Sequence, residues 1–222
     1  MIQLPRLYPI LDSDCFTSAE ALFAAAEELA AAGCTLIQYR NKSGNARVML
    51  EQARALRRRV VSGPHVSQSR RDVGHPLLDI PIRLIMNDRA DLCLAADFDG
   101  VHVGQEDLSP ESVRKIIGPD LWLGVSTHNP EQLAEANLTS AEYLAIGPAF
   151  STSSKANPDP VVGLEGVRRA RALTRKPLVA IGGITRANAA SVIDAGADSV
   201  AVISDLVREP RKSAEEFLRI LG

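Results

Sequence analysis

Short apolar segments alternate with longer helical patterns along nearly the whole chain, and this alternation constrains the fold more than any other sequence feature. The apolar segments are almost continuous in hydrophobic residues, as expected for strands buried on both faces of a parallel sheet. The predicted strands are Leu7–Leu11, Thr35–Tyr39, Arg83–Met86, Gly100–Val103, Leu121–Val125, Tyr143–Ile146, Leu178–Ile181 and Ser199–Ile203. The pattern therefore indicates the α/β class.

Helical patterns fill the intervals between these strands. The first, Ser18–Ala32, has a serine at its N-cap and is followed by Gly33 at a plausible C-terminal cap position. The others are Asn45–Val60, Ser109–Ile117, Pro130–Ala136, Gly163–Leu173, Arg186–Ala195 and Pro210–Leu221, with one more directly after Asp88. Eight strands and eight helices predict a (βα)8 TIM barrel. A doubly wound open sheet is the alternative, because alternation alone does not establish closure.

The chain has 222 residues, near the roughly 250 residues common for a single barrel. We expect one barrel domain over residues 1–222, because no linker or internal repeat divides the sequence. Glycines and prolines interrupt any helix between Lys42 and Arg83. This predicts an insertion at about residues 63–80, between the second and third strands. A tolerated surface loop is the favoured interpretation, and an oligomer contact or a cover of the site is the alternative.

Composition and charge exclude several classes of function. The net charge of −2 gives no electrostatic basis for binding nucleic acid or an anionic membrane. Cys15, Cys34 and Cys93 are scattered, so neither a disulfide framework nor a zinc site is expected. The sequence has no signal-peptide pattern and no membrane-length apolar run. We expect a cytoplasmic protein that acts on small molecules; a homo-oligomer is compatible with the sequence.

Polar patches follow six of the predicted strands. They read QYRNK at 38–42, NDR at 87–89, GQED at 104–107, VSTH at 125–128, TSSK at 152–155 and IGGI at 181–184. A parallel barrel places the carboxyl ends of its strands on one face. There the patches would bring together two carboxylates, three cations, several hydroxyls and a glycine-lined turn. This inventory suits a magnesium-bound diphosphate beside a second phosphate.

Asp88 and Asp107 are the carboxylates of this set. Carboxylates from neighbouring strand ends can share one Mg²⁺, with diphosphate oxygens and water completing its shell. The alternative is that both cap helices, because each lies just before a predicted helix start.

Gln38, Arg40 and Lys42 alternate along one strand end, so their side chains can face one side together. Arginine and lysine are the side chains that bind phosphate groups. Asn87 ends an apolar strand, where a buried amide requires partners. Lys155 lies on a long loop whose composition is typical of a mobile lid. The alternative for these cations is a solvated surface position.

Ser126 is the favoured ligand contact of the fifth strand, and His128 is expected to be structural because no carboxylate nearby in sequence could orient it. His102 and Tyr143 lie inside strands and are expected to be a satisfied core histidine and a packing residue. Gly183 and Ser204 follow the seventh and eighth strands, where many barrels bind phosphate on backbone N–H groups.

The motifs QYRNK, NDR, HVGQEDL, LGVSTH, GPAFSTSSK, GLEGVRRA and AIGGI occur in this order, from YPILD to VAVISDL. Together they closely resemble the thiamine phosphate synthase family. The resemblance implies a TIM barrel that joins 4-amino-5-hydroxymethyl-2-methylpyrimidine diphosphate to 4-methyl-5-hydroxyethylthiazole phosphate. The products are thiamine phosphate and diphosphate, and Mg²⁺ is required.

The resemblance also assigns site residues. The implied pyrimidine diphosphate ligands are Gln38, Tyr39, Arg40, Asn41, Lys42, Asn87, Ser126 and Lys155. The implied thiazole phosphate ligands are Thr152, Ser153, Ser154, Gly183, Ile203 and Ser204. Asp88 and Asp107 would hold the metal, and Arg40, Lys42 and Lys155 would be catalytic. Two departures are Tyr39, where the family usually has leucine, and Ser154, which replaces a common threonine.

The implied mechanism is a dissociative substitution. Diphosphate leaves from a carbon on an amino-substituted ring, and the neutral thiazole nitrogen then attacks without a protein base. Three alternatives stay open at this point. They are a thiazole tautomerase with His128 as acid and base, a Schiff-base aldolase using Lys155, and a non-catalytic barrel that binds thiamine phosphate.

Overall fold

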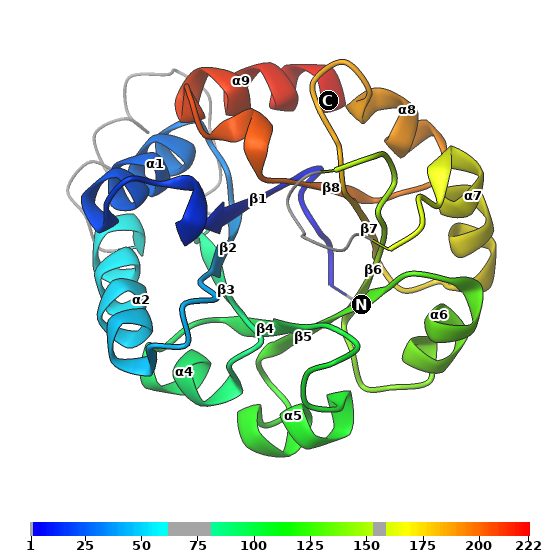
Figure 1. The fold of residues 1–222 in the computed structure, drawn as a ribbon. Coiled ribbons are helices and arrows are strands. Elements are labelled where there is room, and N and C mark those ends of the chain that lie inside the picture. Colours follow the sequence, from blue (N-terminus) through cyan, green and yellow to red (C-terminus); the bar gives the residue numbers. More distant parts are fainter. Residues whose placement is uncertain (1, 62–80, 153–158) are drawn as a thin grey trace.

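The computed structural model describes residues 2–61, 81–152 and 159–222. Its eight parallel strands close into a barrel in sequence order, and β8 pairs with β1. Helices surround the barrel on all sides (Figure 1). The TIM barrel prediction is therefore confirmed, and the open sheet is excluded. The predicted insertion lies outside the described residues.

The strands are β1 Leu7–Asp12, β2 Leu36–Arg40, β3 Arg83–Asn87, β4 Gly100–Val103, β5 Trp122–Thr127, β6 Tyr143–Ile146, β7 Leu178–Ile181 and β8 Ser199–Val202. The described α-helices are α1 Ala19–Ala31, α2 Ala46–Val61, α4 Ala90–Ala95, α5 Pro110–Ile117, α6 Pro130–Asn137, α7 Gly163–Leu173, α8 Ala189–Asp194 and α9 Pro210–Leu221. Short 3-10 turns, η1 Ser13–Cys15 and η2 Ser204–Leu206, follow β1 and β8. All eight predicted strands are present.

Helix α8 begins three residues later than the sequence pattern predicts. Asn188 explains the difference, because its side chain accepts a hydrogen bond from the Thr185 N–H at 2.8 Å and donates to the Gly183 carbonyl at 3.0 Å. These bonds hold the residues before the helix in a turn.

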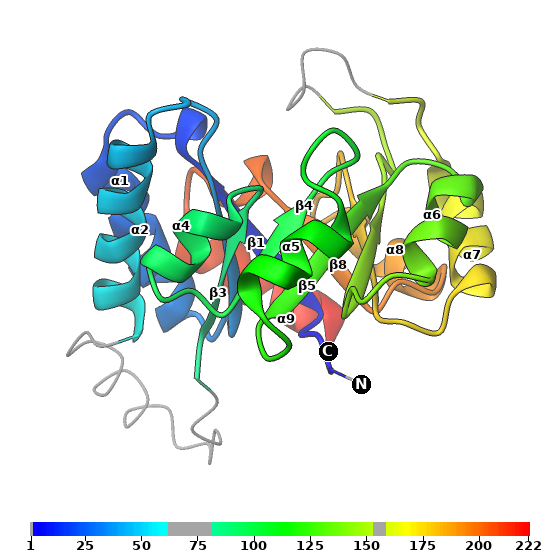
Figure 2. The same ribbon diagram turned by 90° about the horizontal axis from the view of Figure 1, so that it is seen from below.

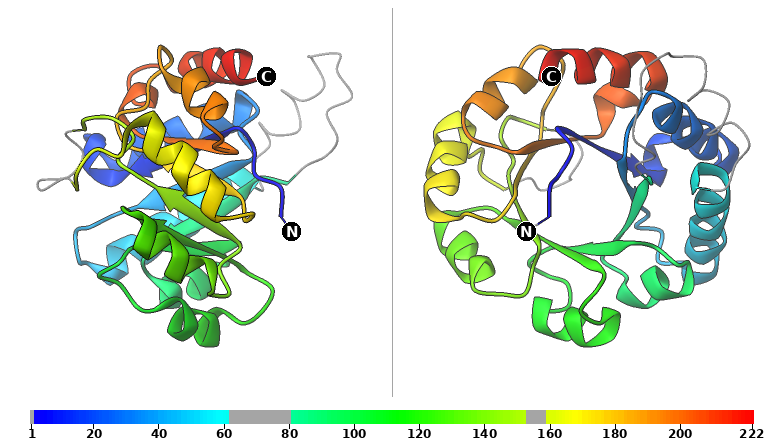
Figure 3. Two further views of the ribbon diagram at one scale, coloured as in Figure 1. Left: turned by 90° about the vertical axis from the view of Figure 1, so that its right-hand side faces the viewer. Right: turned by 180° about the vertical axis from the view of Figure 1, so that it is seen from behind.

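Alternation along the strands separates two cores. Inward-pointing side chains such as Tyr8, Ile85 and Val179 fill the barrel, whereas outward-pointing ones such as Ile37 and Leu144 pack under the helices. The segment before β1 crosses the end of the barrel seen from behind in Figure 3, where Leu4 joins the inner core.

Three carboxylates brace the same end of the barrel. Each precedes a strand, accepts the first N–H of the neighbouring strand or the one after it, and pairs with an arginine from a helix. The sets, here called the lower-face clamps, are Asp99 with Leu84 and Arg57, Glu142 with Leu123 and Arg114, and Asp198 with Leu178 and Arg171. Because each carboxylate directly precedes its strand, the clamps lie at the end opposite the strand carboxyl ends. Both termini lie at that end too (Figure 2).

None of the helices in the described part of the chain combines the length and hydrophobicity needed to cross a membrane.

Candidate active site

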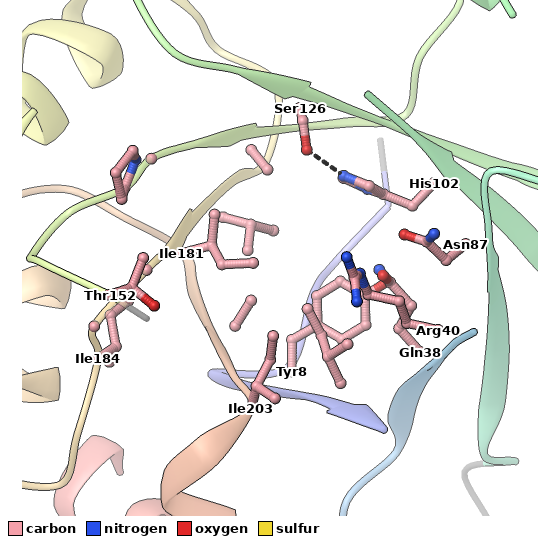
Figure 4. Close-up of a pocket in the computed structure, with 18 of the residues that line it drawn as sticks. Tyr8, Gln38, Arg40, Asn87, His102, Ser126, Thr152, Ile181, Ile184 and Ile203 are labelled. Atoms are coloured by element: carbon pink, nitrogen blue, oxygen red, sulfur yellow. Dashed lines mark hydrogen bonds between the residues drawn. The ribbon is translucent and has the colours of Figure 1, made fainter. Parts of the chain in front are cut away.

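A pocket of about 150 Å³ opens at the carboxyl ends of the strands (Figure 4). Its polar wall carries Gln38, Arg40 and Asn87 beside Ser126 and His102. Thr152 and Ile184 lie on the opposite side. Eight residues predicted for the site line this pocket, namely Gln38, Arg40, Asn87, Ser126, Thr152, Gly183, Ile203 and Ser204. Isoleucine, valine and alanine side chains form much of the remaining wall.

Arg40 is held by an ion pair with Asp12, the last residue of β1. Asp12 is 4% exposed and also accepts a hydrogen bond from the Asp14 N–H at 3.2 Å. The pair is possible because β1 and β2 are paired in register, with Asp12 opposite Arg40. Asp12 therefore aims the guanidinium at the pocket.

Asp88 and Asp107 meet at the rim, as the sequence predicts. The Asp107 carboxyl is close enough to act on the charge of Asp88, and the Lys42 Nζ lies 2.5 Å from an Asp88 oxygen. Burial raises the pKa of Asp88, and Asp107 adds to this increase while Lys42 opposes it. Asp107 also accepts the Gly104 N–H at 2.8 Å.

Helix capping does not account for Asp88. The N-cap of α4 is Arg89, without a capping side-chain hydrogen bond, and that of α5 is Ser109, which caps its own helix. Asp88 instead has a φ of +60°, an uncommon value for a residue with a side chain. Such strain is concentrated at functional sites.

The donor of Asn87 is available to a ligand. Its Nδ2 is buried and has no hydrogen-bond partner among the residues that the structure describes. Buried donors are rarely left unpaired, so an acceptor in the pocket would satisfy this group.

A chain of hydrogen bonds, here called the buried relay, crosses the barrel along the pocket, and four of its five members line the pocket. Gln38 Nε2 donates to the Tyr8 hydroxyl at 2.9 Å, and the Tyr8 and Tyr143 hydroxyls lie 3.0 Å apart. His102 Nδ1 lies 3.1 Å from the Tyr143 hydroxyl, and its Nε2 lies 2.8 Å from Ser126 Oγ. His102 is thus a satisfied core histidine, as predicted. Burial lowers its pKa to about 4.

The turn after β7 approaches neighbouring backbone closely. Gly183 has a φ of +62°, and a Cβ there would lie 2.4 Å from the Ser151 carbonyl oxygen. Only glycine fits both the conformation and the space. Beside it, η2 starts at Ser204 and is fixed by Asp205, which accepts the Arg186 N–H at 2.9 Å.

Comparisons with known proteins agree with this geometry. A sequence model of the family described as thiamine monophosphate synthase matches residues 75–206, more than half of the chain. A thiamine-phosphate synthase from Koribacter versatilis is 56% identical, with 99% of this chain and 97% of that protein aligned. Thiamine phosphate pyrophosphorylase from Pyrococcus furiosus superposes with a TM-score of 0.78 at 32% identity, covering 97% of this chain and 95% of that chain.

The chain belongs to the thiamine monophosphate synthase family. Membership makes it an enzyme, a transferase of thiamine biosynthesis, and favours none of the three alternatives. A relative from Chloroflexus aurantiacus, 41% identical over 91% of this chain and 85% of its own length, carries the same description.

Two residues assigned by the family resemblance do not reach the pocket. The Tyr39 hydroxyl donates to Gln52 Oε1 at 2.5 Å, and Asn41 Nδ2 donates to the same oxygen at 3.0 Å. Both side chains are buried against α2. Alternation explains this placement, since Gln38 and Arg40 point inward and the residues between and after them point outward. The structure therefore does not support a contact between either side chain and a substrate in the pocket.

Lys42, Asp88 and Asp107 lie at the rim rather than in the pocket lining. Three other residues assigned by the resemblance, Ser153, Ser154 and Lys155, lie outside the described residues.

His128 has a carboxylate partner that its sequence neighbourhood does not reveal. Its Nδ1 lies 2.7 Å from the Gly147 carbonyl oxygen and 3.4 Å from Asp159 Oδ2, which comes from beyond β6. The acid comes from a part of the chain that is distant in sequence, and the structural role expected for His128 stays a prediction. Both side chains line the synthase pocket.

Sequence reasoning missed Asp12 and Tyr8, and it gave Tyr143 no polar role. The sequence did contain a signal for the role of each of these three residues. Asp12 ends an apolar strand, and a tyrosine inside a barrel requires a partner for its hydroxyl.

Proposed function

We propose that this pocket joins the aminopyrimidine diphosphate and the thiazole phosphate to form thiamine phosphate and diphosphate. One observation carries the proposal. A single pocket gathers eight residues expected to bind the two substrates, and the two expected metal ligands meet at its rim. The residues expected at the two phosphate groups lie on opposite sides of this pocket (Figure 4).

The residues present fit a magnesium ion. Burial is the main cause of the raised pKa of Asp88, and the negative charge of Asp107 adds to it, so a cation between the two carboxylates would be favoured. Asp88 and Asp107 would hold the ion, which would neutralise negative charge on the departing diphosphate. No cluster of three or more His, Cys, Asp or Glu side chains offers a fuller metal site among the described residues. Substrate oxygens and water would therefore complete the shell.

The protein's own groups would stabilise and shield the ionised pyrimidine. Arg40 and Asn87 present donors to the diphosphate, and Lys42 reaches the same region from the rim. As the carbon–oxygen bond breaks, the ring amino group disperses the positive charge. Ile10 and Ile181 in the wall exclude water that would otherwise trap this cation.

The thiazole phosphate would lie at the other end. Thr152, the Gly183 turn and the Ile203–Ser204 segment supply hydroxyl and backbone groups there. The neutral thiazole nitrogen attacks the methylene carbon from which diphosphate departs, and the nitrogen gives up no proton. This explains why the site needs cations more than a general base.

The experiment is to measure diphosphate release and thiamine phosphate formation from both substrates, with Mg²⁺ and with EDTA. We expect Mg²⁺-dependent release that requires both substrates. Folded protein that forms neither product would reject the proposal and bring the tautomerase and binding alternatives forward. A cytoplasmic location and a homo-oligomer stay predictions of the sequence.

A further inference from the structure

The buried relay connects the two side chains that are expected to contact the pyrimidine. Gln38 stands at one end on β2 and Ser126 at the other on β5, with Tyr8, Tyr143 and His102 between them. The three middle residues are at most 8% exposed. Each hydroxyl has one hydrogen, and a neutral imidazole has one N–H. The relay can therefore run in only one of two directions, and its two ends are coupled.

The Gln38 amide sets the direction. It donates to Tyr8, so the Tyr8 hydrogen points to Tyr143, and the Tyr143 hydrogen points to His102 Nδ1. Because Nδ1 then accepts, the imidazole hydrogen is on Nε2 and points to Ser126 Oγ. Gln38, Arg40 and Asn87 line one side of the pocket (Figure 4). Arg40 and Asn87 are both donors on this side of the pocket. Electrostatics therefore favours the Gln38 amide with its oxygen toward them and its NH₂ toward Tyr8.

This direction leaves a defined pair of groups for a ligand. Gln38 keeps its Oε1 as an acceptor. Ser126 already accepts from His102, so its own O–H is a donor. An acceptor and a donor that face one pocket match the edge of an aminopyrimidine, where an amino group lies next to an unprotonated ring nitrogen. The 4-oxo counterpart has the opposite edge, a carbonyl oxygen beside a ring N–H.

We propose that Tyr8, Tyr143 and His102 are positioning residues that fix this donor and acceptor pair and so make the pocket select a 4-aminopyrimidine over its 4-oxo counterpart. The inference rests on the proposed function, because it takes the pocket to bind the pyrimidine between Gln38 and Ser126.

A glycine in β5, the strand that carries Ser126, leaves space for the relay. A Cβ on Gly124 would lie 2.1 Å from Tyr143 Cζ and 2.4 Å from His102 Nδ1. Gly124 is therefore needed for these rings to meet. The rings themselves lie 5.5 Å apart between centroids. The lowered pKa of His102 keeps its imidazole neutral near pH 7, as the relay requires.

The first test observes the relay without catalysis. Long-range proton–nitrogen NMR correlations of the free protein at pH 7 identify the histidine tautomer, with His102→Gln assigning the signal. We expect the neutral form with hydrogen on Nε2. An Nδ1–H tautomer or an imidazolium would overturn the proposal.

The second test measures selection by calorimetry. The probes are 4-amino-5-hydroxymethyl-2-methylpyrimidine and its 4-oxo analogue. Two mismatched hydrogen bonds predict a preference of about 100-fold for the amino form in the unmodified protein. Tyr143→Phe uncouples the two ends, so the preference should fall to about tenfold or less. Thr174→Val is the control, because it deletes a buried hydroxyl bonded to Asn137 outside the pocket.

The outcomes separate the relay from the reaction. An unchanged preference in Tyr143→Phe, or equal losses in Tyr143→Phe and Thr174→Val, would overturn the relay while leaving the proposed reaction intact. Selective binding by a protein that releases no diphosphate would support the relay and reject the proposed reaction.

Discussion

Individual acids hold the cations of this site in place. Asp12 pairs with Arg40 and Asp88 with Lys42; Asp12 ends β1 and Asp88 directly follows β3. A guanidinium that is already oriented loses less entropy when it binds a diphosphate, so preorganisation raises affinity. The counter-charge also keeps the empty pocket from accumulating uncompensated positive charge.

Asp12→Asn should raise the KM for the pyrimidine diphosphate by about tenfold, because Arg40 loses the partner that orients it. The KM for the thiazole phosphate should change much less. Steady-state kinetics with each substrate varied in turn measures both values. The neighbouring Asp14→Asn is the control, since Asp14 is exposed and its side chain does not pair with Arg40 in the described structure. Equal changes in the two variants would contradict this role of Asp12.

His102 should make the protein less stable in acid. The pKa of histidine falls from its ordinary 6.5 to about 4 here because burial disfavours the charged ring. The unfolded chain therefore binds a proton between these values that the folded chain does not, so stability falls as pH drops through this window. The full difference corresponds to about 3 kcal/mol.

Urea unfolding of the protein and of His102→Gln at pH 7 and pH 4.5 isolates this contribution from that of other acids. The variant should lose less stability between the two pH values. A parallel loss in both proteins would show that His102 does not titrate in this way.

The two ends of the barrel carry different groups of residues. The lower-face clamps join strands and helices at one end, and the pocket occupies the other. Stability and chemistry are therefore carried by different groups, as is common in this fold.

Arg114→Ala should lower the free energy of unfolding by about 3 kcal/mol, because Glu142 and three backbone carbonyls lose a partly buried partner. Both KM values should stay unchanged. Chemical denaturation and kinetics on the same samples test the two statements. Arg168 forms an exposed pair with Glu165 and no other ion pair with the residues that the structure describes, so Arg168→Ala should cost under about 0.5 kcal/mol. A large rise in either KM for Arg114→Ala would link the two ends of the barrel.

Gly183→Ala should raise the KM for the thiazole phosphate by about tenfold or more, because a Cβ would push the β7 turn away from Ser151. Affinity for the pyrimidine diphosphate should be retained. Gly163→Ala is the matched control. It has a similar φ of +64° but no atom within 4 Å of the added Cβ. If both variants impair thiazole phosphate equally, strain rather than the close approach explains the effect.

Closure of the barrel brings the expected sites for both substrates into one pocket. Each strand pairs with two neighbours, so residues from β1 to β8 reach one pocket although they are far apart in the chain. A ligand that binds only this folded frame stabilises the whole molecule by mass action.

Inorganic diphosphate with Mg²⁺ should raise the Tm, and the thiazole phosphate should raise it independently. At about 100 times its Kd each ligand contributes about 2.7 kcal/mol, and the two contributions should add. Differential scanning fluorimetry with and without EDTA measures the metal dependence. Asp88→Asn should remove the Mg²⁺-dependent part and keep the thiazole phosphate shift. Full retention of the Mg²⁺ effect would argue against the proposed metal site.

The sequence by itself determined the α/β class, the positions of the strands, the family and eight of the residues that line the pocket. Hydrophobic periodicity is a local property, so it located all eight strands, and strand order then placed the polar patches on one face. Alternation also contained the information that Tyr39 and Asn41 face outward, although the family resemblance assigned them to a ligand.

Only the tertiary structure decided which distant groups meet. It paired Asp12 with Arg40, brought Asp159 to His128 and threaded the relay through Tyr8, Tyr143 and His102. These contacts depend on the register and inward tilt of strands that are far apart in sequence. No local pattern encodes such distances, because closing the barrel is what brings the partners within hydrogen-bond reach.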